Sequence, residues 1–157
     1  QALKVLTELS RKLDMGLGER DCDPAVVTLT ADTEWMKDHW ARGYVQCVEN
    51  ADLKITLLDE VVAKNLNSGE KLALRWEVIS TAFELLGIET TGAPDTTLSD
   101  IHSDSSSLKS ALRDMIDKAV LLGVVSGYPE GNFKPYKTVN RAEMFKIVTL
   151  FYEVLSF

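Results

Sequence analysis

The sequence has few of the features that mark membrane, nucleic-acid-binding or zinc proteins. Its apolar residues form no run close to the ~20 residues that cross a bilayer. It carries 17 Lys and Arg against 24 Asp and Glu, a net charge of −7, whereas nucleic-acid-binding domains usually show a basic excess. It has only two His and two Cys, and the cysteines match no zinc-ligand spacing. We therefore expect no membrane insertion, no nucleic-acid partner, no metal and no cofactor.

The two cysteines, Cys22 and Cys47, fit either of two roles. They can pack as small buried hydrophobic side chains, or they can form a disulfide in an oxidising compartment. A disulfide requires that their Cα atoms lie within about 7 Å of each other. We expect the pair to be unbridged.

What is present is the composition of a globular domain with several amphipathic helices. Hydrophobic residues make up 45% of the chain and charged residues 26%, which is typical of folded domains. Apolar residues recur every three or four positions, as at Leu3, Leu6 and Leu9, and this period predicts helices. The predicted helices are 1–14, 40–53, 73–86, 108–122 and 140–155, with a weaker one at 57–65. Since only short extended pieces are predicted, at 124–126 and 132–134, we expect a mainly α fold with loop-rich connections.

Parts of the sequence align with one another as repeats of one unit. At one constant offset, the apolar positions of the helix at 40–53 align with those of the helix at 108–122. Arg75-Trp76-Glu77 aligns with Arg141-Ala142-Glu143, and the N-terminal helix aligns with the last helix. The predicted units are the final helix of an incomplete first repeat at 1–15, a second repeat at 16–88 and a third at 89–157. The equivalent helices at 1–14, 73–86 and 140–155 are then expected to pack together.

A Gly- and Pro-rich loop and an arginine precede the last helix. Asn140 and Glu143 have the spacing of a capping box, in which each side chain bonds the other residue's backbone N–H. Arg141 then falls in the first turn, where the helix dipole disfavours a cation unless an anion binds beside the free amides. Gly127 can adopt a left-handed conformation, and Tyr128 opens a Pro-containing turn signature. The loop either forms the wall of an anion site or packs its aromatic residues on the core while Arg141 pairs with a carboxylate.

The loop and the helix start together resemble the S-layer homology (SLH) domain family. The family pattern has a Gly-rich loop with a Gly-Tyr-x-Asp-Gly turn, followed by a helix that begins with Thr-Arg-Ala-Glu. Residues 123–135, GVVSGYPEGNFKP, follow the loop with Glu130 in place of Asp, and residues 140–143, NRAE, follow the helix start with Asn in place of Thr. Asp38-His39-Trp40-Ala41 is similar to the family's His-Trp-Ala segment. The resemblance covers nearly the whole chain and is most specific in the third repeat.

The resemblance implies tandem SLH-like repeats that form a pseudo-threefold central helical bundle. It implies a secreted, extracellular module that anchors a bacterial surface-layer protein to the cell wall, with other surface-layer proteins as further partners. The ligand would be a secondary cell-wall polysaccharide whose terminal sugar carries a pyruvate ketal, bound by an arginine at a helix N-terminus. The ligand-binding candidates are then Arg141 and Arg75, Gly127 and Tyr128 of the loop, and Trp40 as a stacking face or a core anchor.

Departures from the family pattern leave a second function open. The second repeat has Ile55–Asp59 where the third has its Gly-rich loop, and Leu74 cannot cap a helix as Thr would. The third repeat has Leu108 in place of Trp. A degenerate module of this kind would serve as a protein–protein or assembly module of a surface-layer protein, without glycan binding.

We expect no enzymatic activity, because no nucleophile and base stand at a recognisable spacing. His102 reads as a solvated side chain. Asp100 and Asp104 also read as solvated loop residues, since the segment lacks the 12-residue loop of a calcium-binding EF-hand.

Overall fold

The computed structural model describes residues 2–15, 17, 22, 41–56, 72–103 and 106–156. Within these ranges it has five helices: α1 Ala2–Lys12, α2 Arg42–Asn50, α4 Arg75–Leu86, α5 Ser110–Leu121 and α6 Arg141–Leu155. Each lies inside a predicted range, so the predicted mainly helical fold is confirmed. The extended pieces predicted within 124–134 are not strands, and the described residues contain only an isolated antiparallel bridge between Leu74 and Thr138. The weaker helix predicted at 57–65 lies outside the described residues.

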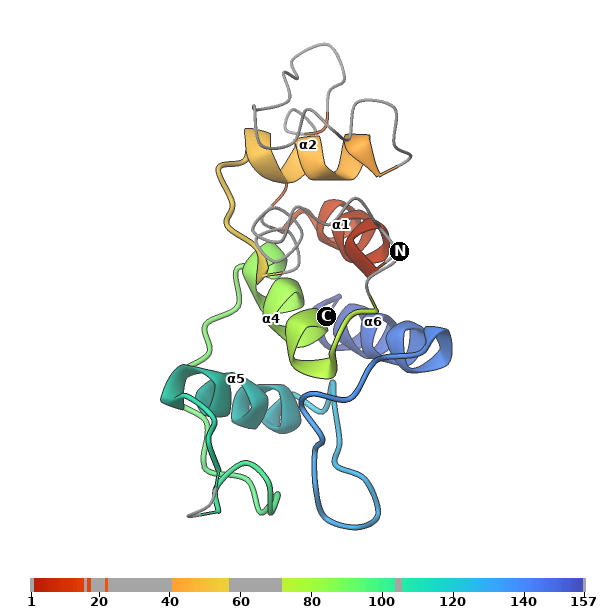
Figure 1. Cartoon of the computed structure of the whole chain (residues 1–157). Helices are drawn as coiled ribbons and strands as arrows, with labels where there is room; N and C mark the ends of the chain where they lie inside the picture. Colours follow the sequence, from red (N-terminus) through yellow and green to blue (C-terminus); the bar gives the residue numbers. More distant parts are fainter. Residues whose placement is uncertain are drawn as a thin grey trace.

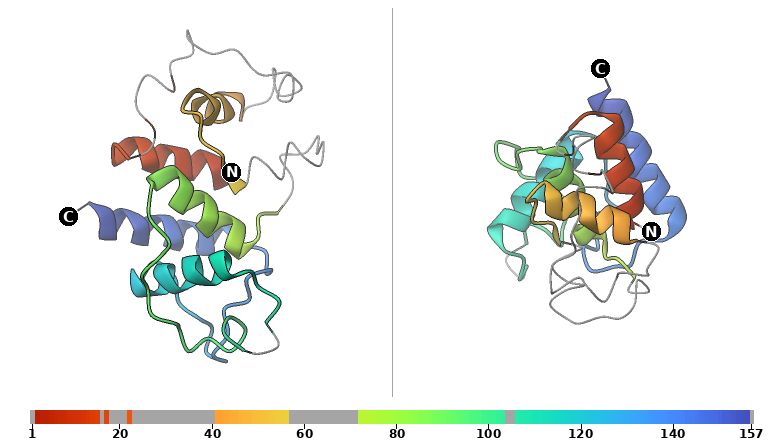
Figure 2. Two further views of the ribbon diagram at one scale, coloured as in Figure 1. Left: turned by 90° about the vertical axis from the view of Figure 1, so that its left-hand side faces the viewer. Right: turned by 90° about the horizontal axis from the view of Figure 1, so that it is seen from above.

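Three helices lie side by side in the middle of the molecule, and the other two lie at its ends (Figures 1 and 2). The central helices are α1, α4 and α6; α1 contacts α2, α4 and α6, and α4 contacts α5. The rings of Phe83 on α4 and Phe151 on α6 meet edge to face, with centroids 5.8 Å apart. The predicted packing of these three helices is therefore confirmed. None of the described helices has both the length and the apolar character needed to cross a membrane.

One continuous core joins the inner faces of the helices. Leu6 of α1 and Ile79 of α4 are buried, as is Ile116 of α5. Phe133, from the loop between α5 and α6, is fully buried as well. Because burial of each such side chain contributes about 1.5–3 kcal/mol, this core holds both the helices and the loop in place.

Cys22 and Cys47 form a disulfide, with Cα atoms 4.3 Å apart. The expectation of an unbridged pair is therefore wrong. The two residues are 25 positions apart in sequence, so tertiary structure and not local sequence brings them together. Closing a loop of this length restricts the unfolded chain and stabilises the folded state by about 3–4 kcal/mol.

Candidate functional site

The loop at 123–139 is fixed by the segment that precedes α5. The Asp100 carboxylate accepts hydrogen bonds from the backbone N–H groups of Phe133 and Lys134, each at 2.7 Å. Such charge-assisted bonds are among the stronger hydrogen bonds in proteins. They hold Lys134 at a φ of 55°, a left-handed conformation that residues with a side chain rarely adopt. Asp100 is therefore a clamp on the loop, and the expectation that it is merely solvated is wrong.

Two glycines shape the loop for different reasons. Gly131 is left-handed, with a φ of 78°, and its N–H donates to the Tyr128 carbonyl at 2.9 Å, which closes the predicted turn. Gly127 is not among the glycines with a positive φ, so it does not use the left-handed conformation that is open to a glycine. A Cβ atom at Gly127 would instead collide with the Leu98 side chain and lie 3.1 Å from the Asn132 carbonyl oxygen. Gly127 is required for this close packing within the loop.

The same loop crosses the N-terminus of α4. The N–H of Arg75 donates to the Lys137 carbonyl at 2.9 Å. The N–H of Trp76 donates to a second loop carbonyl at 3.1 Å. Leu74 has no side-chain oxygen to offer, but its own N–H donates to the Glu77 carboxylate at 2.8 Å. Loop carbonyls therefore occupy amides that are free at many helix N-termini.

The Arg75 side chain is enclosed between the loop and α6, with 8% of it exposed. Its guanidinium carbon lies 4.8 Å from the ring centroid of Tyr128 and 4.6 Å from that of Phe133, within cation–π range. One terminal nitrogen lies 3.7 Å from the Glu143 carboxylate, and the other donates to the Ser126 carbonyl at 3.3 Å. The guanidinium therefore ties the second predicted repeat to the third.

The Tyr128 hydroxyl is the meeting point of three charged side chains. It donates to the Glu143 carboxylate at 2.9 Å and accepts from the Lys137 ammonium at 2.9 Å and from Arg75 at 3.3 Å. Burial raises the pKa of Glu143, but bonds from the Asn140 N–H, Tyr128 and Lys137 outweigh it and lower the pKa overall. The bond to Tyr128, together with the nearby carboxylate, raises the pKa of Lys137. Both shifts favour the charged forms of Glu143 and Lys137.

The N-terminus of α6 has the complete capping box that the sequence predicts. The Asn140 side chain accepts from the Glu143 N–H at 2.9 Å, and the Asn140 N–H donates to the Glu143 carboxylate at 3.1 Å. Arg141, which follows, is exposed. It forms no hydrogen bond or ion pair with any residue that the structure describes, so its guanidinium is open to solvent.

A groove of about 360 Å³ runs between this loop and the segment that precedes α5. Asp100, three serines and Leu108 line one side, and residues 134–137 line the other. The side chain of Tyr136 is prominent here because the residue is 58% exposed. The groove thus offers hydroxyl groups, two lysines and an exposed aromatic ring.

The structure brings together three of the five predicted ligand-binding residues. Arg75, Gly127 and Tyr128 meet at the crossing of the loop and α4, where they bind or contact protein groups. Arg141 lies at the exposed start of α6 and is not among the groove-lining residues. Trp40 lies outside the described residues. Tyr136 and the serines of the groove were not predicted as site residues. A Ser-rich connector is typical of an ordinary polar loop, and the loop's aromatic residues were considered as core residues.

Residues 109–145 match the family model of the S-layer homology domain. The match covers α5, the loop and the first turn of α6. It supports the resemblance found in the third predicted repeat and suggests a cell-surface anchoring module, since domains of this family generally bind cell-wall polymers. No curated protein and no solved structure matches the chain. Because one segment matches, the tandem arrangement stays a prediction.

Proposed function

We propose that this protein anchors a bacterial surface protein from outside the cell by binding an acidic cell-envelope polysaccharide in the groove beside the loop. The observation that carries this proposal is the groove itself. It combines an exposed aromatic ring, hydroxyl groups and two lysines, and four of its residues fall inside the S-layer homology match. The fit of these groups to sugar rings and to carboxylates supports the assignment.

Each group in the groove suits one part of such a ligand. The exposed ring of Tyr136 presents an apolar face with a polar tip, which suits stacking on a sugar. Lys134 and Lys137 suit a carboxylate such as that of a pyruvate ketal. The serine hydroxyls both donate and accept, as the hydroxyl groups of a sugar require.

Local charge favours an anionic ligand although the chain as a whole is acidic. Residues 128–146 contain four basic and two acidic side chains, a local charge of +2. At physiological salt, charges farther than about 10 Å from a site are largely screened. The ligand therefore experiences mainly the nearby lysines and Arg141.

We assign Arg141 to a second anion contact and Arg75 to the support of the loop. Arg141 is exposed and open to solvent, and a guanidinium can bind a carboxylate with two parallel hydrogen bonds. The polar groups of Arg75 and Tyr128 bond each other and protein groups of Ser126, Lys137 and Glu143, so they position the loop. Trp40 stays a predicted stacking face, and the module is proposed to be non-catalytic.

The proposal also includes the repeat organisation. The central position of α1, α4 and α6 supports repeats at 1–15, 16–88 and 89–157 around a pseudo-threefold bundle. The Arg75 contacts, which join the second range to the third, are what an interface between two such repeats requires.

The test is equilibrium binding of the full chain to purified cell-wall polysaccharide, in native form and after chemical removal of pyruvate. We expect binding to the native glycan only. Tyr136→Ala and Arg141→Ala should each weaken it by about tenfold or more, the scale of one lost charged hydrogen bond or stacked ring. Lys54→Ala removes an exposed lysine outside the groove and serves as the control for charge.

Equal binding to the native and the depyruvylated glycan would show that the pyruvate carboxylate is not recognised, and would contradict the proposal of an acidic ligand. No binding to either form, with the fold intact, would favour an assembly module that binds surface-layer proteins instead.

A further inference from the structure

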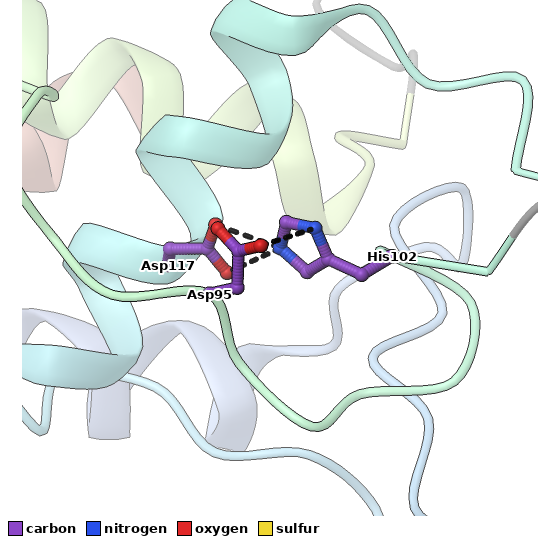
Figure 3. A group of neighbouring side chains, drawn as sticks. All are labelled: Asp95, His102 and Asp117. Carbon is purple, nitrogen blue, oxygen red and sulfur yellow. Dashed lines mark hydrogen bonds and ion pairs between the residues drawn. The ribbon is translucent and has the colours of Figure 1, made fainter.

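Three side chains, two from the connector after α4 and one from α5, lie close together (Figure 3). Asp95 and His102 belong to the connector after α4, and Asp117 lies on α5. The His102 Nε2 atom lies 2.9 and 2.8 Å from the two Asp117 carboxylate oxygens. Its Nδ1 atom lies 3.8 Å from the Asp95 carboxylate. The expectation that His102 is solvated is wrong, because only 22% of its side chain is exposed.

The charge of this cluster is unbalanced. Asp117 is 2% exposed, and a buried carboxylate is costly unless it is paired with a cation or coordinates a metal. Its partners are His102 and the backbone N–H of Thr96, which donates at 3.0 Å. No lysine or arginine among the described residues forms an ion pair with it. Two carboxylates face a single imidazole, so the cluster has a net negative charge in either protonation state of His102.

We propose that Asp95, His102 and Asp117 bind one divalent transition-metal ion of the Zn²⁺ class. Imidazole nitrogen and carboxylate oxygen are zinc ligands, and sites with three protein ligands keep a further position for water. Binding would displace the proton from His102 Nε2, and the 2+ charge would neutralise the two carboxylates.

One of the three ligand pairs already has nearly the spacing of such a site, and the third ligand can move toward it. The three ligand atoms lie within 4.8 Å of one another, whereas a tetrahedral zinc ion with bonds of ~2.0–2.2 Å holds its ligands roughly 3.3 Å apart. The Asp117–His102 pair already lies at close to this spacing. The Asp95 side chain is 84% exposed, so it is free to rotate toward the ion.

The site would have a structural consequence for the groove. His102 lies between Asp100, the clamp on the loop, and Ser103, and both of these residues line the groove. An ion bound to His102 and Asp117 would fasten this segment to α5. The metal would therefore order one wall of the groove, whichever ligand the groove takes.

The experiment titrates Zn²⁺ into the full, EDTA-treated and disulfide-intact chain by calorimetry at pH 7. We expect one ion per chain and a rise in the thermal midpoint, because an ion that binds only the folded state stabilises it. Mg²⁺, which prefers oxygen-only sites, should give neither effect. Asp95→Asn should weaken Zn²⁺ binding by about tenfold or more without changing the midpoint of the metal-free protein, since Asp95 is exposed.

Two further variants make the result decisive. His102→Gln keeps a donor for the Asp117 carboxylate but removes the imidazole, and it should abolish binding. Asp114→Asn, an exposed change on the same helix, should bind as the native chain does. The proposal is overturned if Zn²⁺ gives no heat and no thermal shift, or if Asp95→Asn and His102→Gln bind as tightly as Asp114→Asn.

Discussion

The N-termini of α4 and α6 carry the same Arg-x-Glu sequence and use it in opposite ways. At α4 the loop covers the helix start, encloses Arg75 and occupies the backbone amides. At α6 the capping box is complete, and no described residue covers Arg141. Glu143 belongs to both places, because it caps α6 and pairs with Arg75. The comparison shows that a local motif fixes where a helix begins, whereas tertiary cover decides whether its arginine is structural or open to a ligand.

The largest difference should appear when each arginine is removed. Arg75→Ala should lower the free energy of unfolding by about 2–4 kcal/mol, because it leaves Glu143 and the Tyr128 hydroxyl short of a buried partner. Arg141→Ala should change it by less than about 0.5 kcal/mol, as is usual for an exposed side chain. Urea denaturation with the disulfide intact measures both. Equal losses in the two variants would contradict the assignment of structural and exposed roles.

A smaller effect is expected at the residue that the two helix starts share. Glu143→Gln keeps the capping geometry but removes the charge beside Arg75 and Lys137, so it should cost about 1–2 kcal/mol near neutral pH. The folded-state pKa of Glu143 is lowered from its ordinary value of 4.5. The stabilisation is therefore complete above pH 4.5 and is lost as the pH falls through the folded-state pKa.

The difference between the native chain and Glu143→Gln should accordingly shrink in acid. Chemical denaturation over a pH series measures it. Glu130→Gln is the matched control because Glu130 is more exposed and lies 4.0 Å from its lysine partner; it should show little effect at any pH. A native-to-variant difference that stays constant down to pH 2 would argue against the charged role of Glu143.

The smallest effect should come from the Asn140 side-chain cap, which α6 has and α4 lacks. Asn140→Ala removes the side chain that accepts from the Glu143 N–H and should cost about 0.5–1 kcal/mol. Asn140→Asp keeps an acceptor and should restore most of this stability. If Asn140→Ala destabilised the protein as much as Arg75→Ala, the cap would be essential to the whole loop and not only to the helix start.

The helices were predictable because their signal is local. Leucines at the helical period locate α1, and the spacing of Asn140 and Glu143 locates the start of α6. The match at 109–145 falls where the resemblance is most specific, in the loop whose glycines and prolines set its turns. Such features depend on neighbours a few residues away, and the sequence displays those neighbours directly.

The remaining features depend on contacts between distant segments. Nothing in the chain around Cys22 indicates that Cys47 lies beside it. The burial of Arg75 depends on a loop some fifty residues later, and the meeting of His102 with Asp117 depends on how the connector lies against α5. Gly127 also reads as a flexible turn residue, whereas its role is to make room for Leu98.

The disulfide has a mechanical consequence. When a folded chain is pulled by its two ends, as in a single-molecule experiment, unfolding lengthens it. The disulfide links Cys22 directly to Cys47, 25 positions later in the sequence. The length to which force can extend the unfolded chain is therefore shorter by roughly 80–90 Å. Pulling can separate the helices, but it cannot extend the chain between the two cysteines until the bond is reduced.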